Sequence, residues 1–363
     1  MPYLYSDEQN QIREEVRRTL SGTADPATLR RLLETSGQYD EGYWQTARDM
    51  GWTAMNVAEA DGGLGLSLVE TMIVAEETGR VLAGAPFLAT GFAAAHALKL
   101  GDEPELLGAL AGGQKIVALA FSEGNEPLPL DPAVTIGPDG RVAGEKTAVL
   151  GGAVADMALI LCRDAGGVPA IALIDLNSAG VTRAAIPSID NSRCLAALSF
   201  DGATATVLPL NDAALVARRC LARLALHLAS EAVGGIEACL KMAADYANQR
   251  QAFGQAIGKF QAVKHAISEI YVANELARAS VLDAAVRLEN GDDDAEAYVA
   301  AARLNANHGY DYAAAATTQV HGGIGVTWEA EPHLHYRRAR SLALEAGGAT
   351  YWEDRIASYL EAA

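Results

Sequence analysis

Hydrophobic positions recur with helical spacing at both ends of the chain. Residues 6–9 read Ser-Asp-Glu-Gln, a capping-box sequence, and Ile12, Val16 and Leu20 then fall on one helix face. The pattern stays helical to about residue 112. After residue 212 it predicts long helices, whose apolar rows are Val216, Cys220, Leu224 and Leu228, and then Val263, Ile267, Ile270, Ala277, Val281 and Leu288. Long helices of this kind pack as a bundle.

The middle of the chain has a different pattern. Short β-rich runs, such as residues 116–121 and 157–162, are separated by turn sequences such as 138–140, Pro-Asp-Gly. No helical crossover separates the runs, so antiparallel pairing is expected. The predicted fold class is α+β, mostly α. It comprises an N-terminal helical domain (1–113), a middle antiparallel β domain (114–210) and a C-terminal long-helix bundle (211–363).

Charge and composition limit the partners. The net charge of -18 repels nucleic acid and anionic membrane surfaces. No run of eighteen apolar residues predicts membrane insertion, and the first residues lack the pattern of a signal peptide, so a cytoplasmic location is expected. The four cysteines have no metal-ligand spacing and are expected to be small buried hydrophobes. His333 and His335 are expected on a helix, where residues two apart do not share a face, so no metal site is predicted there.

Three glycine clusters, at 62–65, 322–325 and 347–348, raise the question of a phosphate-binding loop. Each follows a predicted helix and none follows a strand, which excludes the dinucleotide fingerprint of a βαβ unit. A helix C-cap is the simplest interpretation for Gly62 and Gly63.

Residues 246–265 have a more specific pattern. Arg250 and Phe253 lie three positions apart at the end of one helix, two glycines follow, and a new helix begins near Phe260. An arginine here can pair with a pyrophosphate while the phenylalanine covers a flat apolar ring. The alternative is an ordinary turn between helices with a surface arginine.

Four segments together resemble the acyl-CoA dehydrogenase family. Residues 250–265 look like its helix-turn-helix signature, and residues 319–326, Gln-Val-His-Gly-Gly-Ile-Gly-Val, look like its second C-terminal signature. Residues 51–80 are similar to its N-terminal helical domain. Residues 144–146, with 155–156, 190 and 193, are similar to its β domain. The resemblance spans nearly the whole chain in the right order.

The resemblance implies FAD as cofactor, held between the β domain and the bundle and shared with a neighbouring subunit. It implies that Arg250 and Phe253 touch FAD, that Ile257 and Phe260 wall its ring system, and that Gln319, Gly322 and Gly323 approach its pyrophosphate and ribityl side. Phe121 and Ser122 match the flavin-contacting strand end. The match weakens there, because Gly124-Asn125-Glu126-Pro127 replaces the family's proline and glycine-serine pattern. Ala148 also stands where a tryptophan is common.

Family chemistry needs a general base that removes a proton next to the thioester. A carboxylate in a dry pocket suits this role, because desolvation raises its pKa. Aligning the family's C-terminal pattern places Ala346 at the position of the usual glutamate, and Leu224 at the other place where relatives carry it. Glu345, one residue earlier, is the candidate base. A one-residue offset turns a helical side chain by about 100°, so Glu345 serves only where the backbone differs, and is otherwise a solvated carboxylate.

Two functions therefore stay open. The chain is either an FAD-dependent acyl-CoA dehydrogenase, or the non-catalytic subunit of a heteromeric one that completes its partner's FAD site. Residues 334–340 also resemble the paired-subunit dehydrogenases for steroid side chains. The resemblance further implies an acyl-CoA substrate, a homo- or hetero-oligomer (dimer or tetramer) and electron-transfer flavoprotein or a similar acceptor as redox partner. A helical scaffold without redox activity is the third alternative.

Overall fold

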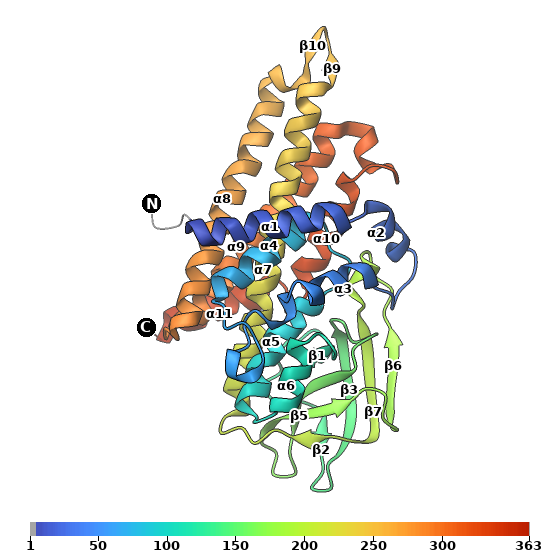
Figure 1. Ribbon diagram of the computed structural model, residues 1–363, viewed down its shortest axis with the longest axis vertical. Coiled ribbons are helices and arrows are strands. Elements are labelled where there is room, and N and C mark those ends of the chain that lie inside the picture. Colours follow the sequence, from blue (N-terminus) through green and yellow to red (C-terminus); the bar gives the residue numbers. More distant parts are fainter. Residues whose placement is uncertain (1–4, 363) are drawn as a thin grey trace. The chain divides into compact units, whose positions relative to one another are not determined.

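Helices, then strands, then long helices follow one another along the chain, as the hydrophobic pattern predicts. The computed structural model describes residues 5–362 (Figure 1). The first helices are α1 (Asp7–Thr23), α2 (Pro26–Leu33), α3 (Glu41–Asp49), α4 (Leu68–Arg80), α5 (Phe87–Leu100) and α6 (Pro104–Ala111). The last are α7 (Ala213–Gln249), α8 (Gln261–Asn290), α9 (Ala295–His321), α10 (Pro332–Leu344) and α11 (Ala349–Ala362). The capping box at Ser6 forms as predicted, with the Ser6 side chain accepting from the backbone of Gln9.

Contacts group the chain into two units that each combine distant segments. One contains residues 5–26, 68–83 and 225–362, and the other contains residues 27–67 and 84–224. The division into domains at 113 and 210 stays a prediction, because the two units are defined by spatial contacts and combine separate segments, whereas the predicted domains are continuous in sequence. No helix in residues 5–362 is both long and apolar enough to span a bilayer.

The second unit holds a mixed sheet in the order β6-β7-β3-β2-β4-β5-β8, with β1 beside β4. Its strands are β1 (Val117–Ala120), β2 (Thr135–Ile136), β3 (Arg141–Val149), β4 (Met157–Arg163), β5 (Pro169–Asp175), β6 (Val181–Ala185), β7 (Ala196–Thr204) and β8 (Thr206–Val207). The predicted antiparallel pairing holds for the ladders β2–β3, β3–β7, β4–β5, β5–β8 and β6–β7. It is wrong for the pairs β1–β4 and β2–β4, which are parallel, because in each pair at least one other strand intervenes along the chain and lets the chain re-enter the sheet in the same direction.

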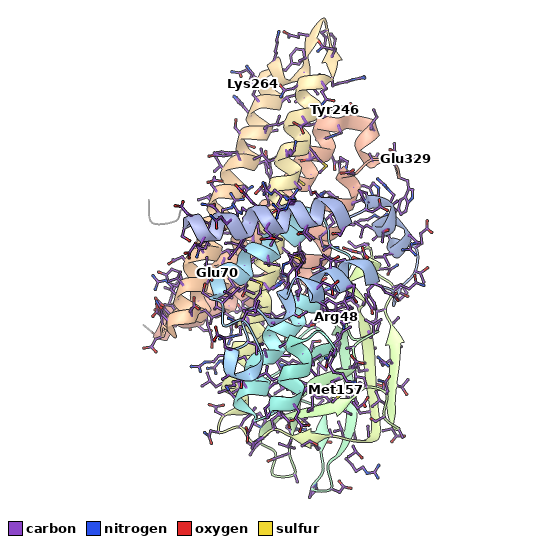
Figure 2. The ribbon with its side chains drawn as sticks, viewed as in Figure 1. Arg48, Glu70, Met157, Tyr246, Lys264 and Glu329 are labelled. Atoms are coloured by element: carbon purple, nitrogen blue, oxygen red, sulfur yellow. The ribbon has the colours of Figure 1, made fainter. Side chains whose placement is uncertain are left out.

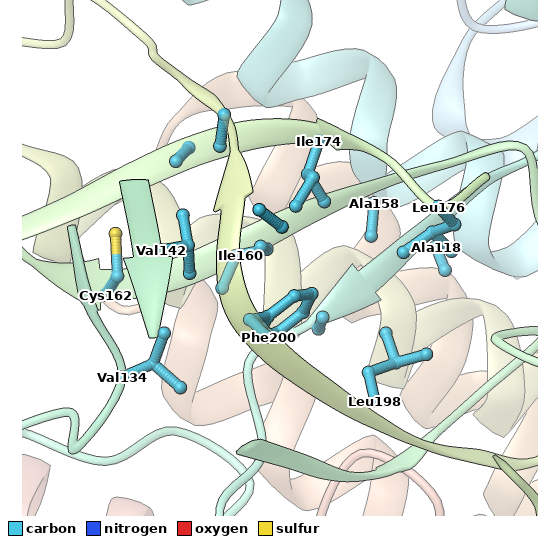
Figure 3. Packing of buried hydrophobic residues seen from close by; sticks show 14 of the residues in the cluster. Ala118, Val134, Val142, Ala158, Ile160, Cys162, Ile174, Leu176, Leu198 and Phe200 are labelled. Atoms are coloured by element: carbon cyan, nitrogen blue, oxygen red, sulfur yellow. The ribbon is translucent and has the colours of Figure 1, made fainter. Parts of the chain in front are cut away.

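The sheet curls around an apolar core. Small and branched side chains that point inward from neighbouring strands fill it, among them Val142, Ile160, Cys162, Ile174 and Phe200 (Figure 3). Each of these is almost fully buried. This packing accounts for the alternation of buried and exposed residues along β3 and β7.

In the first unit, α4 and α7 cross with their backbones in contact. A Cβ atom on Gly234 of α7 would lie 1.8 Å from the carbonyl oxygen of Glu76, and one on Gly79 of α4 would lie 2.0 Å from that of Glu231. On the next residue, Gly235, a Cβ would lie 2.1 Å from the ring of Tyr310 in α9. Only glycine lets these three helices approach so closely.

Buried carboxylates of α4 connect this crossing to α1 and α8. Glu76 accepts hydrogen bonds from Arg13 at 2.7 Å and from Arg278 at 2.6 Å. Glu77, whose side chain is fully buried, accepts from Arg17 at 2.7 Å. Because each buried carboxylate has a guanidinium partner, the desolvation cost of the charges is offset by their attraction.

The four cysteines are free and buried, as the sequence predicts. Burial raises the pKa of the Cys162 thiol to about 11 and that of Cys220 and Cys239 to about 12. These thiols are therefore protonated at neutral pH and act as small hydrophobes.

The helix crossing predicts a large difference between two glycine-to-alanine substitutions. Gly234→Ala drives its Cβ into a backbone oxygen and is expected to lower the free energy of unfolding by about 3 kcal/mol. Gly22→Ala in α1, where an added Cβ meets nothing within 4 Å, is the matched control. It is expected to raise that free energy by about 0.5–1 kcal/mol through helix propensity. Equal unfolding midpoints in denaturant for the two variants would contradict the close crossing.

Candidate functional site

A tight hairpin joins α7 to α8 and carries Arg250 and Phe253. Strand β9 (Gln251–Ala252) pairs with β10 (Gln255–Ala256), and the 3-10 helix η4 (Ile257–Lys259) leads into α8. Phe253 and Gly254 form the two-residue turn with φ of +51° and +79°. Positive φ at both positions is the geometry that matches strand twist, but it is uncommon for phenylalanine. The turn holds the Phe253 side chain almost fully in solvent, 95% exposed.

The residues predicted to wall the flavin ring lie at the base of this hairpin. Ile257 and Phe260 are half-buried, and the Phe260 ring meets the Phe253 ring edge-on with centroids 6.1 Å apart. The Ile257 amide donates to the Arg250 carbonyl at 2.9 Å and closes the hairpin. The predicted turn between helices is thus a hairpin that aligns apolar groups beside an arginine.

The second motif begins where α9 ends. Gly322 has φ +64° and ψ -145°, a conformation that only glycine adopts readily, and opens the 3-10 helix η5 (Gly322–Val326). Gly323 has no such backbone requirement, and a Cβ on either glycine would meet nothing within 4 Å. Packing within the chain therefore leaves Gly323 unexplained, which fits close approach by a group from outside.

Contacts between α7 and α9 bring the two motifs to the same end of the unit. The Thr317 hydroxyl donates to the Cys239 carbonyl at 3.0 Å, and further along both helices the Tyr246 and His321 rings stack with centroids 4.2 Å apart. The contacts advance in the same direction on both helices, which are therefore parallel. Tyr246 and Glu329 mark this end in Figure 2, and the β9–β10 hairpin extends beyond it (Figure 1).

The surface at this end combines an exposed arginine with apolar side chains. The Arg250 side chain is exposed and has no hydrogen-bond or ion-pair partner within residues 5–362, and Gln319 is also exposed. Exposed apolar side chains lie on the same two segments, namely Phe253, Ile324 and Val326. A guanidinium beside apolar and glycine surface suits a ligand with an anionic linker and a flat ring.

Phe121 and Ser122 lie at the end of β1 in the second unit. The Phe121 ring is buried, so only its backbone is available there, and its carbonyl accepts from the Lys146 ammonium at 3.1 Å. The Ser122 hydroxyl donates to the carbonyl of Thr147, and Ala148 follows with φ +50°. The strand end is thus fixed by bonds to β3.

A buried ion pair, which sequence reasoning missed, lies beside this strand end. Lys146 is fully buried, and its ammonium donates to the Glu123 carboxylate at 2.6 Å. Burial lowers the pKa of Lys146. Against the opposing effect of burial, the hydrogen bond from Lys146 lowers the pKa of Glu123. The sequence signal was weak, because Glu123 lies after β1 and is 23 residues from Lys146 in sequence.

The structure buries Glu345, which corrects the interpretation of a solvated carboxylate. It follows the last residue of α10 with extended backbone and is 8% exposed, and its carbonyl accepts from the buried Arg303 at 2.7 Å. Ala346 and Gly347 follow with φ of +56° and +102°. Because the chain has left the helix, the rotation expected for a one-residue offset within a helix does not apply here.

A further buried polar cluster contains a second carboxylate. Glu231 of α7 is 5% exposed, with His227 Nδ1 at 3.4 Å and an Arg338 nitrogen at 4.0 Å from its oxygens. Nearby on α10, His335 Nδ1 and the Tyr310 hydroxyl are 2.8 Å apart, and burial lowers the pKa of His335 to about 3. The i,i+4 spacing of His227 and Glu231 was visible in the sequence, but the contact with Arg338 was not, because Arg338 is about a hundred residues away in sequence.

His333 and His335 do not form a metal site. His335 is buried against α9, whereas His333 is half-exposed and lies 3.1 Å from the Trp328 carbonyl. Within the described part of the chain, no three His, Cys, Asp or Glu side chains are placed to hold a metal ion.

Comparison with known proteins assigns the family. Residues 6–105 match the model of the acyl-CoA dehydrogenase N-terminal domain, and residues 214–358 match that of the C-terminal domain. Acyl-CoA dehydrogenase IpdE2 of Mycobacterium tuberculosis is 30% identical over 93% of this chain and 92% of its own. The structure is also similar to that of the ChsE4-ChsE5 complex of the same species, with a TM-score of 0.89 and 26% identity over 99% of both chains. The Tcur3481-Tcur3483 steroid ACAD G363A variant has a TM-score of 0.87 and 26% identity over 98% of both chains. The chain belongs to the acyl-CoA dehydrogenase family, whose members are FAD-binding flavoproteins.

Proposed function

We propose that this chain takes part in FAD-dependent α,β-dehydrogenation of an acyl-CoA thioester and contributes Arg250, Phe253, Gln319, Gly322 and Gly323 to an FAD site. The observation that carries the proposal is the end of the α7–α9 pair, where an unpaired guanidinium, an exposed phenylalanine and two open glycines gather. Packing within residues 5–362 does not explain this combination.

The residues present fit the dinucleotide. Arg250 donates to the pyrophosphate through its fork of N–H groups, and Gly322 and Gly323 let the ligand touch the backbone. Phe253, with Ile257 and Phe260 behind it, offers an apolar wall and excludes water. When bound, FAD supplies the hydride acceptor.

Glu345 is the proposed general base. It is buried and next to Arg303, and it lies where the chain leaves α10, so its side chain is not on the helix face that the offset argument assumed. A carboxylate in that position takes the proton from the carbon next to the thioester. Glu231, another buried carboxylate, lies close to Arg338 and His227 and is assigned a structural role.

A second function is favoured by specific departures from the family pattern. Ala346, Leu224 and Ala148 replace the residues expected for the base and for the β-domain side of the flavin. The end of the α7–α9 pair keeps its pattern. A chain that keeps only the residues with which it completes its partner's FAD site is the non-catalytic subunit of a heteromeric dehydrogenase. The ChsE4-ChsE5 relative, described as a complex, supports this assembly.

The remaining partners follow from the same relatives. We propose a steroid-derived or other lipid acyl-CoA as substrate, a hetero- or homo-oligomer as the working form, electron-transfer flavoprotein or a similar acceptor as redox partner, and a cytoplasmic location. The steroid description of the Tcur3481-Tcur3483 relative supports the substrate class.

Purification distinguishes the two assemblies. A homomeric enzyme purified alone carries flavin, with absorption near the usual visible bands, and is bleached by an acyl-CoA under anaerobic conditions. A non-catalytic subunit is colourless alone and yellow only with its partner. Flavin absent from both preparations would reject the proposed FAD role.

Arg250→Met is expected to weaken FAD retention about tenfold or more, because a charge-assisted hydrogen bond to phosphate contributes about 1.5–3 kcal/mol. The measurement is the FAD-to-protein ratio after dialysis of whichever preparation holds flavin. Arg18→Met, which removes an arginine with a 76% exposed side chain from α1, is the control and should leave the ratio unchanged. Equal retention in both variants would remove Arg250 from the site.

Glu345→Gln is expected to abolish anaerobic bleaching by acyl-CoA while FAD stays bound, because the amide cannot accept the proton at neutral pH. Glu353→Gln, an exposed carboxylate on α11, is the matched control and should bleach at the normal rate. Normal bleaching in the Glu345 variant would exclude it as base. Glu231→Gln, compared for folding as well as bleaching, then tests the structural role of that residue.

A further inference from the structure

Three basic side chains meet in the second unit, where α5 packs against the first turns of α7. Arg219 and Arg223 are four residues apart on α7 and therefore share one helix face. Between them in sequence, the buried Cys220 thiol lies within hydrogen-bonding reach of the backbone of Ala97 in α5. The charges of Arg223 and Arg219 both act on the imidazole of His96, the residue before Ala97, so the three side chains lie close together.

This cluster has no acceptor within residues 5–362. Neither arginine forms an ion pair or a side-chain hydrogen bond there, although the chain contains 46 acidic residues. His96 Nε2 is buried and has no hydrogen-bond partner. Arg223 and His96 are half-buried. Buried polar and charged groups normally have partners, because losing water without gaining a bond is costly.

The charges in this cluster are all positive. Burial, and then Arg223 and Arg219, lower the pKa of His96 to about 3, so the imidazole is neutral at physiological pH. Burial and then Arg219, opposed by Cys220, lower the pKa of Arg223, which still stays charged. The two guanidinium groups therefore repel each other, and no carboxylate of the described residues forms an ion pair with either of them.

We propose that Arg219, Arg223 and His96 bind the oxyanion of a small-molecule ligand, either a phosphate or a carboxylate. Two guanidinium groups donate to the oxyanion, and neutral His96 donates one further hydrogen bond from Nε2–H. The bound charge removes the repulsion and gives each donor an acceptor. A solvated helix face explains Arg219, which is exposed, but it does not explain the buried, unpaired nitrogen of His96.

This site is separate from the residues proposed to hold FAD. It involves none of Arg250, Phe253, Gln319, Gly322 or Gly323, and its occupation needs neither flavin nor turnover. The proposed FAD role and this anion site therefore fail independently.

Calorimetric titration of the full chain, with its partner subunit where the two purify together, tests the proposal at constant ionic strength in chloride. The probes are inorganic phosphate, CoA and propionate. Saturable binding of inorganic phosphate identifies a phosphate ligand, and CoA counts toward it only where inorganic phosphate displaces it, because CoA is also part of the proposed substrate. Saturable binding of propionate identifies a carboxylate. Either result supports the oxyanion site if Arg223→Met weakens it at least tenfold.

Two further variants complete the test. Arg219→Gln changes an exposed position, so folding is expected to be retained, and it should also weaken binding at least tenfold. Arg218→Gln, one position along α7, lies about 100° around the helix and should leave binding unchanged. No saturable binding by any probe overturns the proposal. So does binding that is equal in the wild type, Arg223→Met and Arg219→Gln.

Discussion

The parallel contact between α7 and α9 is the constraint on which the first unit depends. Gly235 lets the Tyr310 ring lie against the backbone of α7, and the Tyr246–His321 stack fixes the same register further along. Helices that interlock through a ring and a glycine do not slide continuously, because each intermediate position would create a clash or a void. The register therefore determines that the hairpin after α7 and the glycines after α9 end at the same place, although about seventy residues separate them in sequence.

Much of the fold could be predicted because its signals are local. The capping box at Ser6, the apolar rows of the long helices and the β-rich runs each depend on neighbours within a few residues. Two features needed information from distant residues. The parallel pairing of β1 with β4 depends on how the chain returns across the sheet, and the crossing of α4 with α7 depends on Gly79 and Gly234 meeting. Each of these glycines, taken alone, only weakens a helix.

The candidate site shows the same division. The pattern of Arg250, Phe253 and the paired glycines was visible in the sequence, but only the resemblance to a family gave it a ligand. The hairpin was not predicted, because a Phe-Gly turn departs from the usual Asn-Gly preference. The surroundings of Glu345 could not be predicted, because the direction of its side chain depends on whether the helix continues through residue 345 or ends before it. The positive φ of Ala346 could not be predicted either, because an alanine in the sequence does not indicate a left-handed backbone conformation.

The two unpaired arginine sites have different weight as evidence. Arg250 is exposed, so water solvates it and the absence of a partner costs little. The proposed role of Arg250 in FAD binding therefore depends on Phe253 and the glycines nearby. Arg223 and His96 are half-buried, so the absence of an acceptor there is a cost that folding alone does not require. In a chain of net charge -18, the general field disfavours anions, and binding one needs a local excess of donors. A carboxylate of the chain placed among these arginines would stabilise the fold and also block that binding, so its absence is what an anion-binding function requires.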